Sequence, residues 1–232
     1  MALARPRRLW SGKARFVKLC GSGTGVGFTP RPNWSVWAIF AVWPDEGRAR
    51  QHVSDHPVFA RWRRRAAEDW TVFLSPTSAR GSWSGVNPLV SPGDTPAPAE
   101  GPIAALTRAS VRPQFARSFW RRVPDISSVI GSDPNVLFKI GIGEVPLLHQ
   151  VTFTIWPDAS AMAGFARRMG PHASAMQAAR DGGWFAEELY ARFRVIGSAG
   201  LWGNRDPLDG AQDGQRRPAH RPPKATDERD AA

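Results

Sequence analysis

Apolar residues recur at every second position in several short segments of the chain, the spacing expected of β-strands. These segments are 14–20, 34–43, 70–75, 103–111, 135–143, 149–156 and 192–202. Between them, three longer segments have helical spacing, at 45–69, 113–131 and 158–191, the last broken near Gly170-Pro171 and Gly182-Gly183. In the second half of the chain this predicts the order βαββαβ, the ferredoxin-like unit.

Part of this pattern occurs twice. "FVKLCGSGTGVGFTPRPNWSVWAIFAVWPD" (16–45) matches "FKIGIGEVPLLHQVTFTIWPD" (138–158), and 71–83 matches 191–202. The matching Trp43 and Trp156 are 113 residues apart, too far for a solenoid repeat, so we predict a duplicated domain. Only about a dozen residues precede Arg15, so the first copy is expected to lack its N-terminal strand.

Strand 34–43 is apolar on both faces, so covering one face with helices would leave a costly exposed patch on the other. The patch disappears if the sheet of the second copy faces it. We therefore predict an α+β fold in which tandem ferredoxin-like repeats form, within one chain, the barrel that such units usually form as a dimer. Its interior is a candidate apolar cavity.

The predicted organisation has four parts. Residues 1–85 are the first repeat, N-terminally incomplete, and residues 86–102 are a Pro-rich linker. Residues 103–202 are the second repeat, and residues 203–232 are a disordered polar tail.

The charge of the chain lies in its folded part. The formal net charge is +11, and residues 1–202 carry 25 Lys and Arg against 14 Asp and Glu, so an anionic partner is expected. Nucleic acid is the obvious one for a ferredoxin-like fold, but "FKIGIGEV" lacks the aromatic core of an RNA-recognition strand, and we predict no nucleic-acid binding.

The sequence gives no signal for secretion or for crossing a membrane. The N-terminus lacks an apolar signal core, and the longest apolar run, 36–43, is far short of the ~20 residues that span a bilayer. The only cysteine is Cys20, which suits a reducing cytoplasm. We expect a cytoplasmic protein, with peripheral contact to an anionic membrane surface as a further expectation.

No catalytic residue can be identified from sequence motifs. The loop "GSGTGVGF" (21–28) fits no phosphate-binding pattern, and Glu187-Glu188 reads as a solvated helix face. Two histidines fall on apolar faces. His149 shares a strand face with Val151, Phe153 and Ile155, and His172 shares a helix face with Met162, Phe165, Met169 and Met176. Either is a core histidine or an imidazole ligand of the kind that haem iron takes.

Four strings resemble spheroidene monooxygenase, the acyclic carotenoid 2-ketolase family of purple phototrophic bacteria. They are "KLCGSGTGVGFTPRPNWSVWAIFAVWPD", "RWRRRAAEDWTVFLSPTSARGSWSG", "DPNVLFKIGIGEVPLLHQVTFTIWPD" and "GGWFAEELYARFRV", and the resemblance covers about residues 13–208. It implies an O2-dependent monooxygenase that hydroxylates C-2 of spheroidene twice, which gives spheroidenone. It also implies haem iron as cofactor and reduced ferredoxin as electron donor. The family has an N-terminal strand and helix that this chain mostly lacks.

The resemblance also directs the choice of site residues. His172 is the expected haem ligand, His149 the alternative, and Cys20 a third choice. The expected cavity wall that binds the carotenoid comprises Trp37, Phe40, Trp43 and Phe153, and Arg80 and Lys139 are candidates for haem propionates or ferredoxin. The alternative function is a non-catalytic haem- or lipid-binding barrel.

Overall fold

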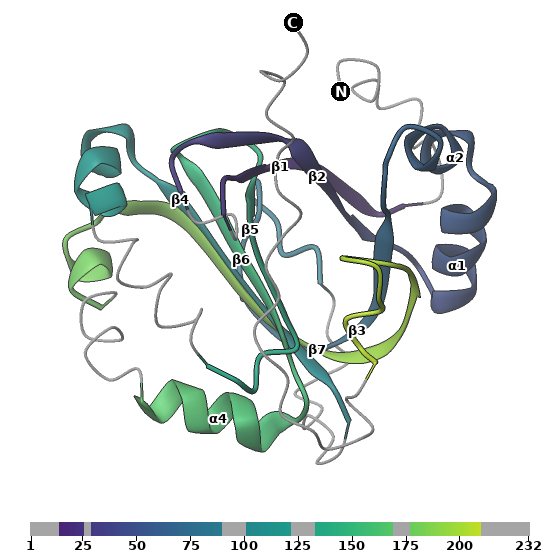
Figure 1. Cartoon of the computed structure of the whole chain (residues 1–232). Helices are drawn as coiled ribbons and strands as arrows, with labels where there is room; N and C mark the ends of the chain where they lie inside the picture. The colour runs from purple at the N-terminus through teal and green to yellow at the C-terminus, as the bar shows by residue number, and fades with distance from the viewer. Residues whose placement is uncertain (1–13, 26–28, 90–100, 122–132, 169–176, 210–232) are drawn as a thin grey trace, which may run out of the picture.

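Seven antiparallel strands form one curled sheet in the order β2-β1-β5-β6-β4-β7-β3, with helices outside it (Figure 1). The computed structural model describes residues 14–25, 29–89, 101–121, 133–168 and 177–209. The strands are β1 Phe16–Gly23, β2 Pro32–Val42, β3 Trp70–Gly81, β4 Ile103–Val111, β5 Phe138–Gly143, β6 His149–Trp156 and β7 Phe185–Gly200. The α+β class predicted from the sequence is confirmed at this level.

The alternating pattern located most strands well. β4 and β6 have the predicted bounds, and β1, β2 and β5 lie within three residues of theirs. β3 continues to Gly81, six residues beyond the predicted end, because it pairs along its whole length with β7.

Two predicted helices were wrong in part. Segment 45–69 forms two shorter helices, α1 Glu46–Asp55 and α2 Pro57–Arg63, because Pro57 cannot continue α1. In the segment 158–191, α4 is Ala159–Arg168 and residues 177–181 are helical, but residues 185–191 belong to β7. They pair with β4 from Phe185 onward and with β3 from Leu189 onward, which overrides the helix preference of "AEEL".

The two faces of the sheet carry different side chains. The face that we call the inner face gathers one core from all seven strands, including Cys20, Phe40, Leu74, Leu106, Phe138, Phe153 and Phe193. The outer face meets the helices. Trp156 and Ile103 pack there against Met162 and Phe165 of α4, and Val111 packs against Phe119 in the helical residues 116–121. Those helical residues and α4 lie at opposite ends of β4 and β6 (Figure 1).

The polar tail was predicted to begin at residue 203, yet residues 203–209 pack on the sheet. Asp206 accepts hydrogen bonds from Trp70 Nε1 (3.1 Å) and Ser198, and Leu208 contacts the inner core. Residues 210–232 lie outside the described ones. Among the helices that the structure describes, none has the length and apolar character needed to cross a bilayer.

Candidate functional site

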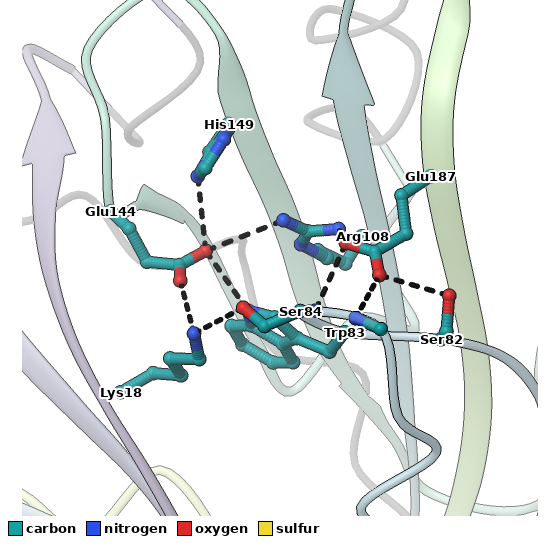
Figure 2. A network of polar contacts seen from close by, with 9 residues as sticks. Lys18, Ser82, Trp83, Ser84, Arg108, Glu144, His149 and Glu187 are labelled. Carbon is teal, nitrogen blue, oxygen red and sulfur yellow. Dashed lines mark hydrogen bonds and ion pairs between the residues drawn. The ribbon is translucent and has the colours of Figure 1, made fainter.

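Charged side chains meet at one end of the inner face, in a group that we call the inner polar cluster (Figure 2). It consists of Lys18 from β1, Arg108 from β4, Glu144 after β5, His149 from β6 and Glu187 from β7. Each strand member lies two positions from an apolar residue of the inner core, so its side chain points to the same side; these residues are Cys20, Leu106, Val151 and Leu189. The cluster is therefore the polar end of an otherwise apolar surface.

The turn between β5 and β6 brings Glu144 and His149 together. A Cβ atom on Gly143 would lie 1.9 Å from the carbonyl oxygen of His149, so only glycine allows the two strands to approach this closely. The backbone N–H of His149 donates to Val145 O at 3.0 Å, which closes the turn. His149 Nδ1 then lies 3.3 Å from Glu144 Oε2.

Glu144 is the centre of the cluster. One carboxylate oxygen pairs with Lys18 Nζ at 3.0 Å, and the other accepts from Trp83 Nε1 at 2.9 Å and lies 3.7 Å from Arg108 Nη2. Lys18 also donates to Ser84 Oγ at 2.5 Å. These contacts fix the carboxylate that faces His149.

Arg108 is the most deeply buried charge of the cluster, with 1% of its surface exposed. Its guanidinium pairs with Glu187 and lies 5.6 Å from the centre of the Trp83 ring. Two buried nitrogens of the cluster, Arg108 Nε and His149 Nδ1, have no aligned hydrogen-bond acceptor among the described residues. Because such atoms usually find a partner, both mark a place where a further polar group would be stabilised.

Glu187 is held ionised by its surroundings. Burial opposes its charge, but N–H groups of Gly85 and Ser84, the Ser82 hydroxyl and Arg108 outweigh burial and lower its pKa to about 2, from 4.5. Gly81, with φ of 94°, makes this possible, since its left-handed turn directs residues 82–85 toward the Glu187 carboxylate.

This pKa predicts a pH dependence of stability. Because the folded pKa lies below the ordinary one, Glu187 stabilises the fold above about pH 4.5, and the contribution is lost as the pH falls from about 4.5 to about 2. The shift alone corresponds to about 3 kcal/mol, and solvent screening of this partly exposed carboxylate lowers its contribution below that value. We expect Glu187→Gln to remove that part of the acid dependence of the unfolding free energy, measured by urea titration. Glu46→Gln, which breaks an exposed pair with Arg50, is the matched control and should follow the wild-type curve.

Cys20 lies in the inner core, with its side chain fully buried. Burial, with Glu144 nearby, raises the pKa of its thiol to about 12, so without a metal ion the thiol is protonated at neutral pH. Cys20 as a ligand stays a prediction.

The structure separates the four aromatic residues expected to line one cavity. Phe40 and Phe153 belong to the inner core. Trp37 in β2 and Trp43, directly after it, are each three positions from Phe40 and point to the other side. There Trp37 is 39% exposed, and the ring of Trp43 lies 4.7 Å from that of His52. A single wall made by all four is therefore corrected to an inner pair and an outer pair.

The two charged candidates lie on the outer side of the sheet. Lys139 alternates with the inner residues Phe138 and Ile140, and burial lowers its pKa. Arg80 lies 4.8 Å from the ring of Tyr190, which alternates with the inner residues Leu189 and Ala191. Both side chains therefore point away from the inner face that carries His149. His172 lies outside the described residues.

Sequence reasoning missed Arg108, Glu144 and Glu187. A signal for Arg108 was present in the sequence. It lies two positions after Leu106 and four after Ala104, so its side chain points to the same buried face of the strand. Glu187 was hidden by the helix predicted over it.

If the chain binds haem, His149 would hold the iron through its imidazole. It lies on the inner face with Nδ1 3.3 Å from Glu144 Oε2, a separation at which the two atoms are not aligned for a hydrogen bond. Among the described residues, no three His, Cys, Asp or Glu side chains are grouped to hold a metal ion by themselves.

Three named proteins are similar to the chain over most of its length. Spheroidene monooxygenase of Rhodobacter capsulatus is 55% identical over 196 residues, which cover 84% of this chain and 81% of that protein. Spheroidene monooxygenase of Cereibacter sphaeroides is 54% identical, covering 84% of this chain and 60% of that protein. Spheroidene monooxygenase of Rubrivivax gelatinosus is 37% identical, covering 83% of this chain and 73% of that protein.

The other comparisons add little. No family model matches the chain. A crystal structure from Fusobacterium nucleatum, assigned as a monooxygenase, aligns over 81% of this chain and 78% of its own with a TM-score of 0.40 and 11% identity. The crystal structure of an anthrone oxidase-like protein aligns over 82% of this chain and 79% of its own, with a TM-score of 0.32 and 11% identity. At these scores neither structure bears on fold or function.

Proposed function

The chain belongs to the spheroidene monooxygenase family, and from that membership we propose that it is a carotenoid ketolase acting on acyclic carotenoids such as spheroidene. The observation that carries this function is the 55% identity to the Rhodobacter capsulatus protein over 84% of the chain. The alternative of a non-catalytic haem- or lipid-binding barrel has no comparable support.

For the fold, we propose the tandem ferredoxin-like arrangement. β7-β4-β6-β5 are strands four, one, three and two of the second unit, which is the ferredoxin-like order. Equivalent strands of the two copies pair with each other, β1 with β5 and β3 with β7. β1, β2 and β3 then take positions two, three and four of the first unit. The ferredoxin-like order would place strand one of that unit between the sheet edges β2 and β3.

The reaction proposed is ketone formation at C-2. Each of two hydroxylations consumes one O2, two electrons and two protons, and places one oxygen atom on the carbon while the other leaves as water. The resulting geminal diol loses water to give the ketone. We propose haem as the cofactor that activates O2, since no side chain oxidises an unactivated C–H bond.

The chain's own residues would bind and orient the reactants. The inner core, with Phe40 and Phe153, supplies apolar surface for a polyene. We propose His149 as the residue that holds the iron, with Glu144 positioning its ring. The sequence prediction of His172 stays open. For electrons, we propose reduced ferredoxin, an acidic protein that a chain of charge +11 would attract.

The function is tested by the carotenoids of cells that carry the chain. In Cereibacter sphaeroides cells deleted for their own spheroidene monooxygenase, expression of the chain is expected to yield the 2-keto product, measured by chromatography of pigment extracts. The added carbonyl lengthens the conjugated system and shifts absorption to longer wavelength. If folded protein accumulates and spheroidene stays unconverted, the ketolase function is wrong.

A further inference from the structure

Exposed apolar side chains gather at one end of the sheet. Six large hydrophobic side chains of the described residues are exposed, and five of them, which we call the apolar rim, lie at the end that carries the inner polar cluster. The rim comprises Trp34 (72% exposed), Trp37 (39%), Val86 (53%), Val145 (39%) and Leu147 (45%); the sixth, Leu201 (50%), follows the far end of β7.

Pairing and hydrogen bonds connect the parts of the rim. Trp37 is opposite Gly21 on β1, and Gly21 is opposite Gly143, which begins the turn containing Val145 and Leu147. On another side of that turn, Trp120 Nε1 donates to Leu147 O at 2.8 Å. Val86 O accepts from Trp83 N at 2.7 Å, and the Trp83 ring reaches Glu144.

The two tryptophans are held outward by a bulge. Ser22 pairs with Asn33 and Gly21 with Trp37, so residues 34–36 are extra on β2. Within this bulge Trp37 Nε1 donates to Trp34 O at 2.7 Å, and the two rings lie 6.1 Å apart. The indoles therefore form a fixed exposed pair rather than two unrelated side chains.

Positive charge accompanies the rim. Arg31 precedes β2, and Arg112, Arg117 and Arg121 are on or beside the helical residues 116–121; all four are exposed. The carboxylates of Glu144 and Glu187 at this end are already paired with Lys18 and Arg108. Exposed indoles and aliphatic side chains among arginines match the interface of an anionic bilayer, where aromatic rings sit at headgroup level.

We propose that the apolar rim docks on the surface of an anionic lipid bilayer. This places the end that carries His149 against the phase in which a long apolar carotenoid dissolves. Only the identity of the transferred substrate rests on the proposed function, because the contact itself needs neither carotenoid nor cofactor. A protein partner would favour a contiguous apolar patch with a polar border, whereas the rim consists of separate exposed side chains from the bulge of β2 and from two turns.

The test uses the full chain with pigment-free vesicles of equal parts phosphatidylcholine and phosphatidylglycerol, followed by flotation. Wild type is expected to float with these vesicles and to remain unbound with phosphatidylcholine alone. The double variant Trp34→Gln, Leu147→Asn should bind about tenfold more weakly, since two side chains lose their burial in lipid. Asn suits position 147 because its φ is 67°. Arg117→Gln should weaken binding about fivefold.

Matched controls are available at the far end of the sheet. Leu201→Asn changes a side chain of similar exposure, and Arg194→Gln removes an exposed charge from β7, so both should bind as wild type. Wild type that fails to float, or rim and control variants that lose binding equally, would overturn the proposal. So would rim variants that keep vesicle binding but lose binding to reduced ferredoxin, which would assign the surface to a protein. Carotenoid conversion in detergent is measured separately, so failure of the ketolase function is distinguishable.

Discussion

Replacing Arg108 with methionine is expected to lower the free energy of unfolding by about 3–5 kcal/mol, because it leaves two carboxylates in the inner polar cluster without their shared cation. Arg108 is 1% exposed, pairs with Glu187 and lies 3.7 Å from Glu144. Methionine keeps much of the volume and the packing against Trp83, so the loss reports charge rather than a cavity. Urea titration at neutral pH measures it.

Two further variants distinguish the effect of the Arg108–Glu187 ion pair from the effect of removing any arginine. Arg192→Met removes an exposed arginine from β7, and we expect a change within about 0.5 kcal/mol. The double variant Arg108→Met, Glu187→Gln also removes the Glu187 carboxylate that the single variant leaves unpaired. Its loss of unfolding free energy should therefore be smaller than the sum of the losses in the two single variants. An Arg108→Met protein as stable as wild type would mean that water already solvates the cluster.

The sheet could largely be predicted from the sequence, and its final strand could not. The bounds of β4 and β6 agree with the pattern, and β6 alternates Val151, Phe153 and Ile155 with Gln150, Thr152 and Thr154. β7 begins with "FAEEL", in which Ala, Glu and Leu favour a helix, and pairing with β4, joined by β3 from Leu189 onward, makes it extended. Local preference therefore fails where pairing with a neighbouring strand outweighs it.

The candidate site was predictable only in part, for a related reason. Alternation placed His149 on the same face as Val151 and Phe153, and the inner core agrees. Its partner Glu144 depends on a turn that only Gly143 permits, and Arg108 meets Glu187, 79 residues later. Contacts between residues this far apart in the sequence depend on the order of the strands in the sheet, which a single sequence does not specify.

The inner polar cluster combines two tasks that mutation can separate. Arg108 and Glu187 are buried and joined to backbone N–H groups, so their removal should cost stability. His149 is at the edge, with 24% of its side chain exposed, and contributes one contact to Glu144. A change at His149 should therefore leave the fold intact and alter what the inner face binds.

His149→Ala is expected to abolish formation of the ketone and the haem absorption band of the purified protein, while the urea midpoint stays close to that of wild type. The physical reason is that alanine removes the imidazole that would hold the iron and leaves no side chain in its place. The small stability change follows from the partial exposure of the ring. Absorption spectra, haem extraction and pigment analysis measure the three quantities.

The controls decide between this residue and the sequence-predicted ligand. His56→Ala removes an imidazole that caps α2 away from the inner face, so it should cost about 1 kcal/mol of stability and no haem. Added imidazole should restore the band in His149→Ala, because it re-supplies the missing ligand in the space the side chain left. If His149→Ala keeps its band and His172→Ala loses it, iron binds to His172, and Glu144 then serves only the ion pairs of the cluster. If neither variant loses the haem absorption band, then neither His149 nor His172 binds the iron.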